Sequence, residues 1–388
     1  MSKNQISNGA EYAPTAKTKQ VVQPGEFVFA SAFMDHGHIY GQTDALKKAG
    51  ATLKWAYDPD QERLAQFLKE NPEAQAADSY DQILNDPEIR MVTSAAVPAE
   101  RAEIGFQALQ VGKDYFTDKS PFTSMEQLEK ARKIVAETNQ KYMVYYSERL
   151  HNEAGMRAGQ LIADGAVGRV LQVLNLAPHR LEKAARPDWF FDKEKYGGIL
   201  TDIGSHQFEQ FLAYTGARDA TINFARVDNF NNPDKPGLED FGEASLTADN
   251  GASFYCRVDW FTPDGSPVWG DGRTFVIGTE GTLEVRKYSD PCRQAPDSRI
   301  FLTNGEKEQE IECFGNIGFP FFGDLILDSL NRTEKAMTQA HVFKAAELSM
   351  KAQAFADAIK YKGASSSAAH AKQQPVPLYR NRMLRSAS

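Results

Sequence analysis

The chain has 388 residues and a formal charge of −8, and 41% of its residues are hydrophobic. This length predicts two domains, and the acidic balance without a long lysine or arginine run argues against a nucleic-acid surface. Three cysteines without CxxC spacing indicate neither a disulfide framework nor a zinc site, and no stretch is apolar enough to span a membrane. We therefore expect a cytoplasmic globular protein.

The first half of the chain alternates strand and helix patterns. Residues 1–25 are polar and lack the apolar segment of a signal peptide, so we expect a flexible N-terminal arm. Because parallel strands need helical crossovers, the alternation over residues 26–148 predicts an α/β domain with an open, doubly wound sheet. The predicted strands are 27–33, 52–57, 91–96, 114–117 and 142–146, and the predicted helices are 39–49, 61–71, 80–85, 100–111 and 125–138.

The pattern changes beyond residue 148 to that of an antiparallel α+β domain over 149–362. Residues 279–281 form a turn with a glycine available for positive φ, which predicts a hairpin. The last helices can pack back on the first domain, and residues 363–388 are predicted to be an extended C-terminal arm. The predicted strands are 171–176, 220–226, 243–248, 252–260, 274–278 and 282–287, and the predicted helices are 154–164, one ending at 214, 321–332 and 340–360.

The loop after the first strand is a candidate cofactor site. Only the middle glycine of a dinucleotide-binding GxGxxG is present, and it could let the backbone approach a pyrophosphate at a helix N-terminus. Asp58 ends the second strand, where an acidic residue binds both ribose hydroxyls and favours NAD over NADP, although it could instead cap the next helix. Two histidines of the loop lack a third ligand at recognisable spacing, so we expect no metal site. The loop reads Asp35, His36, Gly37, His38 and Ile39.

Three residues further along supply a cation, a carboxylate and an imidazole. Lys119 ends a predicted strand, and Asp202 and His206 follow the Gly-Gly turn at 197–198. An imidazole can take the proton of a hydroxyl while hydride leaves the same carbon, and an ammonium can stabilise the alkoxide. On a helix, Asp202 and His206 share a face, so the carboxylate can orient the imidazole. The alternative is a buried histidine that is hydrogen-bonded for packing.

These motifs resemble those of the glucose–fructose oxidoreductase and inositol dehydrogenase family, Gfo/Idh/MocA. The family carries a Glu-Lys-Pro motif and a later Gly-Gly-x-x-x-Asp-x-Gly-x-His-x-x-Asp, which here read 118–121 and 197–209. Similar positions are Pro98, Glu148 to Leu150, Arg186 to Trp189 and Ile277 to Gly281. The resemblance covers roughly residues 26 to 360. Asp118 in place of glutamate, Ser120 in place of proline and the glycine-poor loop indicate a divergent branch.

The resemblance implies an NAD(P)-binding Rossmann domain and a C-terminal domain with a large open, mainly antiparallel sheet, through which homodimers or homotetramers form. Lys119 would contact substrate and nicotinamide, His206 would be the acid/base, and Asp202 would bind a substrate hydroxyl or support the histidine. Besides the loop and Asp58, cofactor contacts are expected from Ala96, Pro98, Asp118, Lys119 and Arg149.

We interpret the chain as an NAD-dependent oxidoreductase acting on a secondary alcohol of a sugar, sugar derivative or cyclic polyol, without a nucleic-acid or membrane partner. His179, Arg180 and Trp189 lie beside the expected cleft and could bind the sugar, or they form a structural loop with one buried aromatic. Two alternatives are a redox-assisted lyase or glycosidase that retains NAD and a non-catalytic sugar or cofactor sensor. The presence of a base argues against the sensor.

Overall fold

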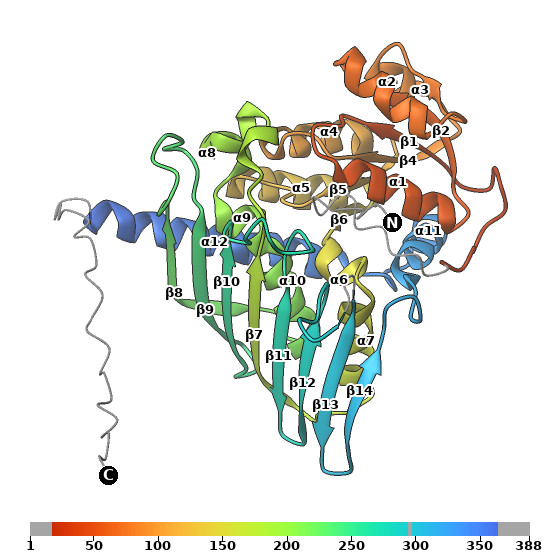
Figure 1. Cartoon of the computed structure of the whole chain (residues 1–388). Coiled ribbons are helices and arrows are strands. Elements are labelled where there is room, and N and C mark those ends of the chain that lie inside the picture. The colour runs from red at the N-terminus through yellow and green to blue at the C-terminus, as the bar shows by residue number, and fades with distance from the viewer. Residues whose placement is uncertain (1–17, 294–296, 364–388) are drawn as a thin grey trace, which may run out of the picture.

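The computed structural model describes residues 18–293 and 297–363, which build two adjoining sheets (Figure 1). The first sheet has the strand order β3-β2-β1-β4-β5-β6, and every neighbouring pair is parallel. This finding confirms the predicted doubly wound sheet. Its strands are β1 (Val28–Ala32), β2 (Thr52–Tyr57), β3 (Gln75–Ala76), β4 (Ile89–Ser94), β5 (Asp114–Asp118) and β6 (Tyr142–Tyr145).

Helices cross between the parallel strands of this first sheet. Strand β1 pairs with β2 on one side and β4 on the other, so the strand order reverses there. Such a reversal opens a crevice at the carboxyl ends of the strands, where α/β sheets bind their ligands. The crossover helices are α1 (His38–Lys48), α2 (Gln61–Glu70), α3 (Tyr80–Asn85), α4 (Pro98–Gln110) and α5 (Met125–Thr138).

The second sheet has eight strands in the order β14-β13-β12-β11-β7-β10-β9-β8. All its pairs are antiparallel except that of β7 with β10, so the predicted mainly antiparallel sheet is also confirmed. Its strands are β7 (Val170–Pro178), β8 (Ala220–Asp228), β9 (Phe241–Ala248), β10 (Ser253–Asp259), β11 (Arg273–Gly278), β12 (Gly281–Arg286), β13 (Arg299–Asn304) and β14 (Glu308–Glu312).

Helices cover one face of this eight-stranded sheet (Figure 1). In β7, Val173 and Ala177 are buried beneath them, whereas the alternate residues Leu174 and Leu176 are only half-buried. No helix of the described residues covers the other face. The remaining helices are α6 (Ser147–Leu150), α7 (Glu153–Ala163), α8 (Lys193–Tyr196), α9 (Ile199–Asp202), α10 (Gly204–Thr215), α11 (Pro320–Asn331) and α12 (Gln339–Gly363), with short 3₁₀ turns at Lys183–Ala185 and Asp188–Phe191.

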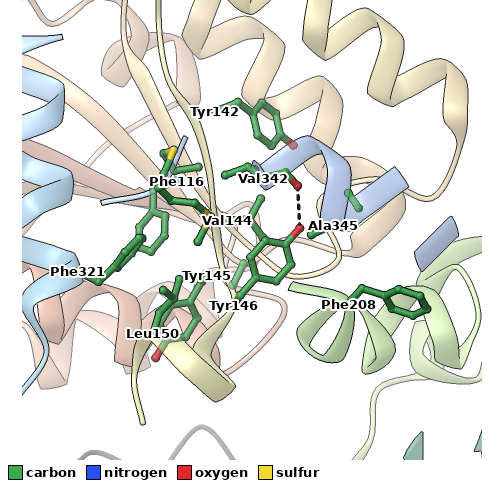
Figure 2. Close-up of a cluster of buried hydrophobic side chains, with 14 of the residues drawn as sticks. Phe116, Tyr142, Val144, Tyr145, Tyr146, Leu150, Phe208, Phe321, Val342 and Ala345 are labelled. Atoms are coloured by element: carbon green, nitrogen blue, oxygen red, sulfur yellow. Dashed lines mark hydrogen bonds between the residues drawn. The ribbon is translucent and has the colours of Figure 1, made fainter. Parts of the chain in front are cut away.

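The last two helices join the two parts of the chain. The Tyr146 hydroxyl, just beyond β6, donates to the carbonyl of Val342 in α12 at 3.2 Å, and Figure 2 shows this bond inside a cluster of buried side chains. Phe321 of α11 packs against Phe116 of β5 in the same cluster. Helix α12 also contacts α9 and α10 of the second domain. The carboxyl end of β5 is therefore held in place relative to α9 and α10.

Several local predictions differ from the structure. Strands β3, β13 and β14 were not expected. Strand β3 has only two residues, and β14 is charged at alternate positions, so neither shows a clear strand pattern. Residues 274–278 and 282–287 do form a hairpin, but its Gly281 lacks positive φ, and a Cβ there would lie 2.6 Å from the carbonyl oxygen of Thr303. The glycine therefore permits close approach of β13. Among the described residues, no helix is long and apolar enough to cross a membrane.

Candidate active site

A cavity of about 240 Å³ lies where the carboxyl ends of the first sheet meet the second domain. The loop after β1 contributes four of its lining residues, Asp35 to His38, and Lys119 follows β5. The second domain contributes His206 of α10, the loop after β7, and several aromatic side chains. Of the residues expected to bind cofactor or substrate, those that line the cavity are Asp35, His36, Gly37, His38, Lys119, His179, Arg180, Trp189 and His206.

Lys119 and Asp202 form a buried ion pair across the domain boundary. Lys119 Nζ donates to Asp202 Oδ1 at 2.6 Å, and both side chains are less than 10% exposed. Burial opposes ionisation of Asp202, but the ammonium of Lys119 outweighs it, so the pKa of this carboxyl lies below its ordinary value. An ammonium has three N–H donors, so Lys119 can also bind a ligand oxygen.

The turn at 197–198 places Asp202 at this site. Gly198 has a φ of +92°, which glycine adopts without strain, and a Cβ there would lie 2.3 Å from the side chain of Gln353. Gln353 of α12 accepts a hydrogen bond from the backbone N–H of Leu200 at 3.0 Å. The last helix thus fixes the turn from which α9 starts.

His206 enters the cavity as a neutral base. Its side chain is 2% exposed, and burial, with the charges of Lys119 and His38 adding to it, lowers its pKa to about 3 despite the opposing effect of Glu148. Its Nδ1 has no hydrogen-bond partner among the described residues. A neutral imidazole in a cavity can accept a proton from a bound hydroxyl.

The expectation that Asp202 orients His206 is wrong. The carboxylate of Asp202 bonds to Lys119 instead, and no hydrogen bond joins the two side chains in the described part of the chain. The helix is also interrupted between them, because α9 ends at Asp202 and α10 starts at Gly204. Spacing along a helix shows which side chains share a face, but it does not show that a lysine of the other domain binds the carboxylate.

Asp118 organises the loop after β1. His38 Nδ1 lies 2.8 Å and His36 Nδ1 3.2 Å from the two oxygens of this carboxylate. The structure therefore supplies the third group that the sequence did not show, and the three groups are close enough to hold a cation. However, Arg101 Nη2 donates to the same carboxylate at 3.2 Å. We interpret the cluster as a hydrogen-bonded network around the Asp118–Arg101 ion pair, because a guanidinium would repel a metal ion.

Asp58 anchors the same loop from the end of β2. Its Oδ2 accepts from the backbone N–H of Met34 at 2.6 Å, and its Oδ1 accepts from Arg63 Nη2 at 3.0 Å. Asp60, not Asp58, caps α2, because its side chain accepts from the backbone N–H groups of Glu62 and Arg63. The alternative of a helix-capping Asp58 is thus wrong.

Two expected site residues, Arg149 and Arg180, bond to neighbouring protein groups, and of these only Arg180 lines the cavity. Arg149 donates through Nε to Glu209 at 2.9 Å, and the Nη2 of Arg180 donates to the carbonyls of Ser266 and Val268. Both arginines therefore hold neighbouring protein groups. Expected site residues that are buried and do not line the cavity are Ile39, Asp58, Ala96, Pro98, Asp118 and Asp202.

Several cavity residues escaped the sequence analysis of the site. Glu148 belongs to a stretch already noted for its family resemblance, but no local pattern marked its side chain as functional. The aromatic residues come from segments far apart in the chain, and no periodicity reveals such positions. The unexpected lining residues are Tyr145, Ser147, Glu148, His151, Ala185, Arg186, Pro187, Phe190, Trp260, Trp269 and Tyr288.

Comparison with known proteins identifies the family. The model of the oxidoreductase family with an NAD-binding Rossmann fold matches residues 32–146, and that of the Gfo/Idh/MocA C-terminal domain matches residues 156–284. Together they cover more than half of the chain. The protein therefore belongs to the Gfo/Idh/MocA family of oxidoreductases, and its first domain is an NAD-binding Rossmann domain.

Individual relatives agree with this assignment. A crystal structure from Erwinia carotovora atroseptica, described as an oxidoreductase, is 44% identical with a TM-score of 0.83, covering 85% of this chain and 99% of that one. The scyllo-inositol 2-dehydrogenase (NAD⁺) of Bacillus subtilis is 24% identical over 64% of this chain and 70% of its own. The D-xylose dehydrogenase of Paenarthrobacter nicotinovorans is 23% identical over 37% of this chain, which spans 38% of that relative.

The buried neutral histidines predict a loss of stability in mild acid. Burial lowers the pKa of both His206 and His151 to about 3, whereas an unfolded histidine has a pKa of about 6.5. Unfolding therefore takes up protons below pH 6.5, so this stability is complete above that pH and is lost as pH falls towards 3. The two groups should reduce the free energy of unfolding by about 4 kcal/mol between pH 7 and pH 5.

Urea denaturation at several pH values measures this dependence. A His206→Asn variant, which lacks one titrating ring, should show a decrease that is smaller by about 2 kcal/mol. A free energy of unfolding that stays constant from pH 7 to pH 5 in the unaltered protein would show that these imidazoles are not held neutral.

Proposed function

We propose that the protein is an NAD-dependent dehydrogenase that oxidises a secondary alcohol of a sugar, sugar derivative or cyclic polyol. The supporting observation is that a charged lysine and a neutral histidine, Lys119 and His206, open on one cavity beside the Rossmann crevice. The names of the B. subtilis and P. nicotinovorans relatives point to the same substrate class.

Two side chains carry the proposed proton chemistry. The ammonium of Lys119 donates a hydrogen bond to the reacting oxygen and stabilises the negative charge that develops there. His206 accepts the hydroxyl proton on its ring nitrogen, because it is neutral when substrate arrives. Asp202 holds Lys119 in place through their 2.6 Å bond. NAD, when bound, would supply the hydride acceptor in its nicotinamide ring, and the loop of residues 35–38 would hold the pyrophosphate of NAD.

Charge around β2 supports NAD rather than NADP. Arg63 could attract a 2′-phosphate, but its Nη2 lies 3.1 Å from Asp35 and 3.0 Å from Asp58, and its Nη1 lies 3.5 Å from Asp60. Three carboxylates surround one guanidinium, so the cluster is negative overall. A phosphate would be repelled there, whereas ribose hydroxyls would not.

The open face of the second sheet supports assembly into a dimer or tetramer. Leu174 and Leu176 of β7 lie on this uncovered face, and Phe275 and Ile277 of the neighbouring β11 belong to the same alternating set. An uncovered sheet face that carries these apolar side chains is a candidate interface between copies of one chain. We propose that a second copy covers it.

The charge cluster around Arg63 makes a testable prediction about cofactor choice. NADH should bind more tightly than NADPH, and Asp58→Ala should narrow that gap by about tenfold, the equivalent of about 1.4 kcal/mol. Fluorescence titration with both cofactors measures the two dissociation constants. Glu62→Ala is the control. It removes an exposed carboxylate from α2, the helix that carries Arg63, and should leave the difference between the two affinities unchanged. Equal affinities for the two cofactors in the unaltered protein would contradict the assignment.

The mechanism is tested by removing the proposed base. His206→Ala should lower kcat about 10²- to 10⁴-fold, the usual effect of losing a general base, while the affinity for NADH changes little. Lys119→Ala should also slow the reaction. The assay follows NADH formation from NAD⁺ with scyllo-inositol, myo-inositol, D-xylose and D-glucose.

The same assay separates the alternatives. A dehydrogenase accumulates NADH with its substrate, a redox-assisted lyase consumes substrate without net NADH, and a sensor turns nothing over. Near-full activity of His206→Ala would reduce this histidine to a packing residue.

A further inference from the structure

Glu148 is a buried carboxylate that lines the cavity but has no part in the proposed proton chemistry. Its side chain is 2% exposed, and Oε2 accepts from Gln207 Nε2 at 2.8 Å and from Lys287 Nζ at 3.0 Å. The other oxygen, Oε1, has no hydrogen-bond partner among the described residues. Burying an acceptor without a donor costs stability, so such atoms in a ligand cavity point to a bound group.

A second acceptor faces this oxygen. His179 Nε2 lies 3.5 Å from Glu148 Oε1, while His179 Nδ1 lies 3.1 Å from the carbonyl oxygen of Ala177. Because a carbonyl can only accept, Nδ1 carries the proton of the neutral ring and Nε2 presents a lone pair. Burial lowers the pKa of His179 to about 4, so the ring is neutral near pH 7. Two acceptors therefore face each other without a protein donor.

The adjoining wall offers a donor and flat apolar faces. Trp269 Nε1 is buried without a hydrogen-bond partner in the described residues. The centroid of the Trp269 ring lies 4.4 Å from the centroid of the His179 ring. Trp260 lines the same cavity, and the centroid of its ring lies 5.4 Å from the centroid of the His179 ring. Aromatic faces with a few convergent polar atoms are typical of sites that bind the ring and hydroxyls of a sugar.

The charge balance favours a neutral ligand group over a cation. Lys287 is 1% exposed and already pairs with Glu148, so the two buried charges compensate each other. A ligand ammonium would add an unbalanced charge to a buried site, which is strongly unfavourable. A hydroxyl can donate its hydrogen to Glu148 Oε1 or His179 Nε2 and can accept from Trp269 Nε1.

We propose that Glu148, together with His179 and Trp269, forms a specificity subsite that binds a second hydroxyl of the substrate, apart from the one that reacts at Lys119 and His206. This inference rests on the proposed dehydrogenase function and makes the substrate a polyhydroxylated ring rather than a simple alcohol. An alcohol without the second hydroxyl would leave Oε1 unpartnered and would bind weakly.

Glu148→Gln tests this subsite. Gln207 and Lys287 keep the amide oxygen at the Oε2 position because both donate hydrogen bonds, so the new NH₂ group faces the cavity and places a donor where the acceptor was. Isothermal titration of the NADH-bound protein with scyllo-inositol, myo-inositol, D-xylose and D-glucose identifies the tightest ligand. Glu148→Gln should weaken its binding about 10- to 100-fold, as expected for losing a hydrogen bond to a charged group. The affinity for NADH should stay unchanged.

Two further variants separate binding from folding. Glu153→Gln alters another buried glutamate, which accepts from the backbone N–H of Ile317 and Gly318 outside the cavity. It can lower stability but should leave ligand binding intact. Trp269→Phe removes the donor and keeps an aromatic ring, so it should also weaken binding, and it serves if Glu148→Gln fails to fold.

Monodeoxy derivatives of the tightest ligand locate the hydroxyl. One derivative should bind the unaltered protein weakly but lose no further affinity to Glu148→Gln, because hydroxyl and carboxylate form one interaction. If Glu148→Gln binds the ligand as tightly as the unaltered protein, the subsite is wrong while the dehydrogenase proposal stands. If the unaltered protein binds NADH but none of the four compounds, the polyol class itself is wrong and the subsite falls with it.

Discussion

The ion pair between Lys119 and Asp202 is the contact on which the arrangement of the site depends. It joins the carboxyl end of β5 to the end of α9, and so it joins the Rossmann sheet to the second domain. A buried ion pair gives little net stability by itself, but removing one partner leaves an uncompensated charge. The ion pair therefore fixes the position of the Rossmann domain relative to the second domain, so that a ligand in the cavity contacts both domains.

The rest of the fold supports this contact from a distance. Helix α12 packs beside β6 through Tyr146 and Val342 and also holds the turn before α9 through Gln353. Around the pair, burial keeps His206 neutral while Lys119 adds a positive charge nearby. A cation and a neutral base in one cavity suit an alcohol that loses its proton as its carbon is oxidised. Each group thus has the charge state that the proposed reaction requires before the ligand binds.

The sequence predicted both sheets and singled out Lys119 and His206, which the structure places on one cavity, because both results depend on local patterns. Strand and helix periodicity marks the alternating first half, and Lys119 and His206 lie in short motifs with fixed spacing. Partners across the domain boundary were not predictable. The four-residue spacing suggested that Asp202 orients His206. Only the folded chain shows that the carboxylate of Asp202 accepts a hydrogen bond from Lys119 instead. In the same way, the bond of Arg149 to Glu209 was not predictable, nor was that of Arg180 Nη2 to loop carbonyls beside the cavity.

The central claim is that Lys119 and His206 act on the same hydroxyl of a polyol. A crystal structure of the protein with NADH and the tightest-binding polyol tests it most directly. We predict one hydroxyl oxygen within hydrogen-bonding distance, about 3 Å, of both Lys119 Nζ and a ring nitrogen of His206. A polyol seated in the cavity with no oxygen shared by these two side chains would contradict the account.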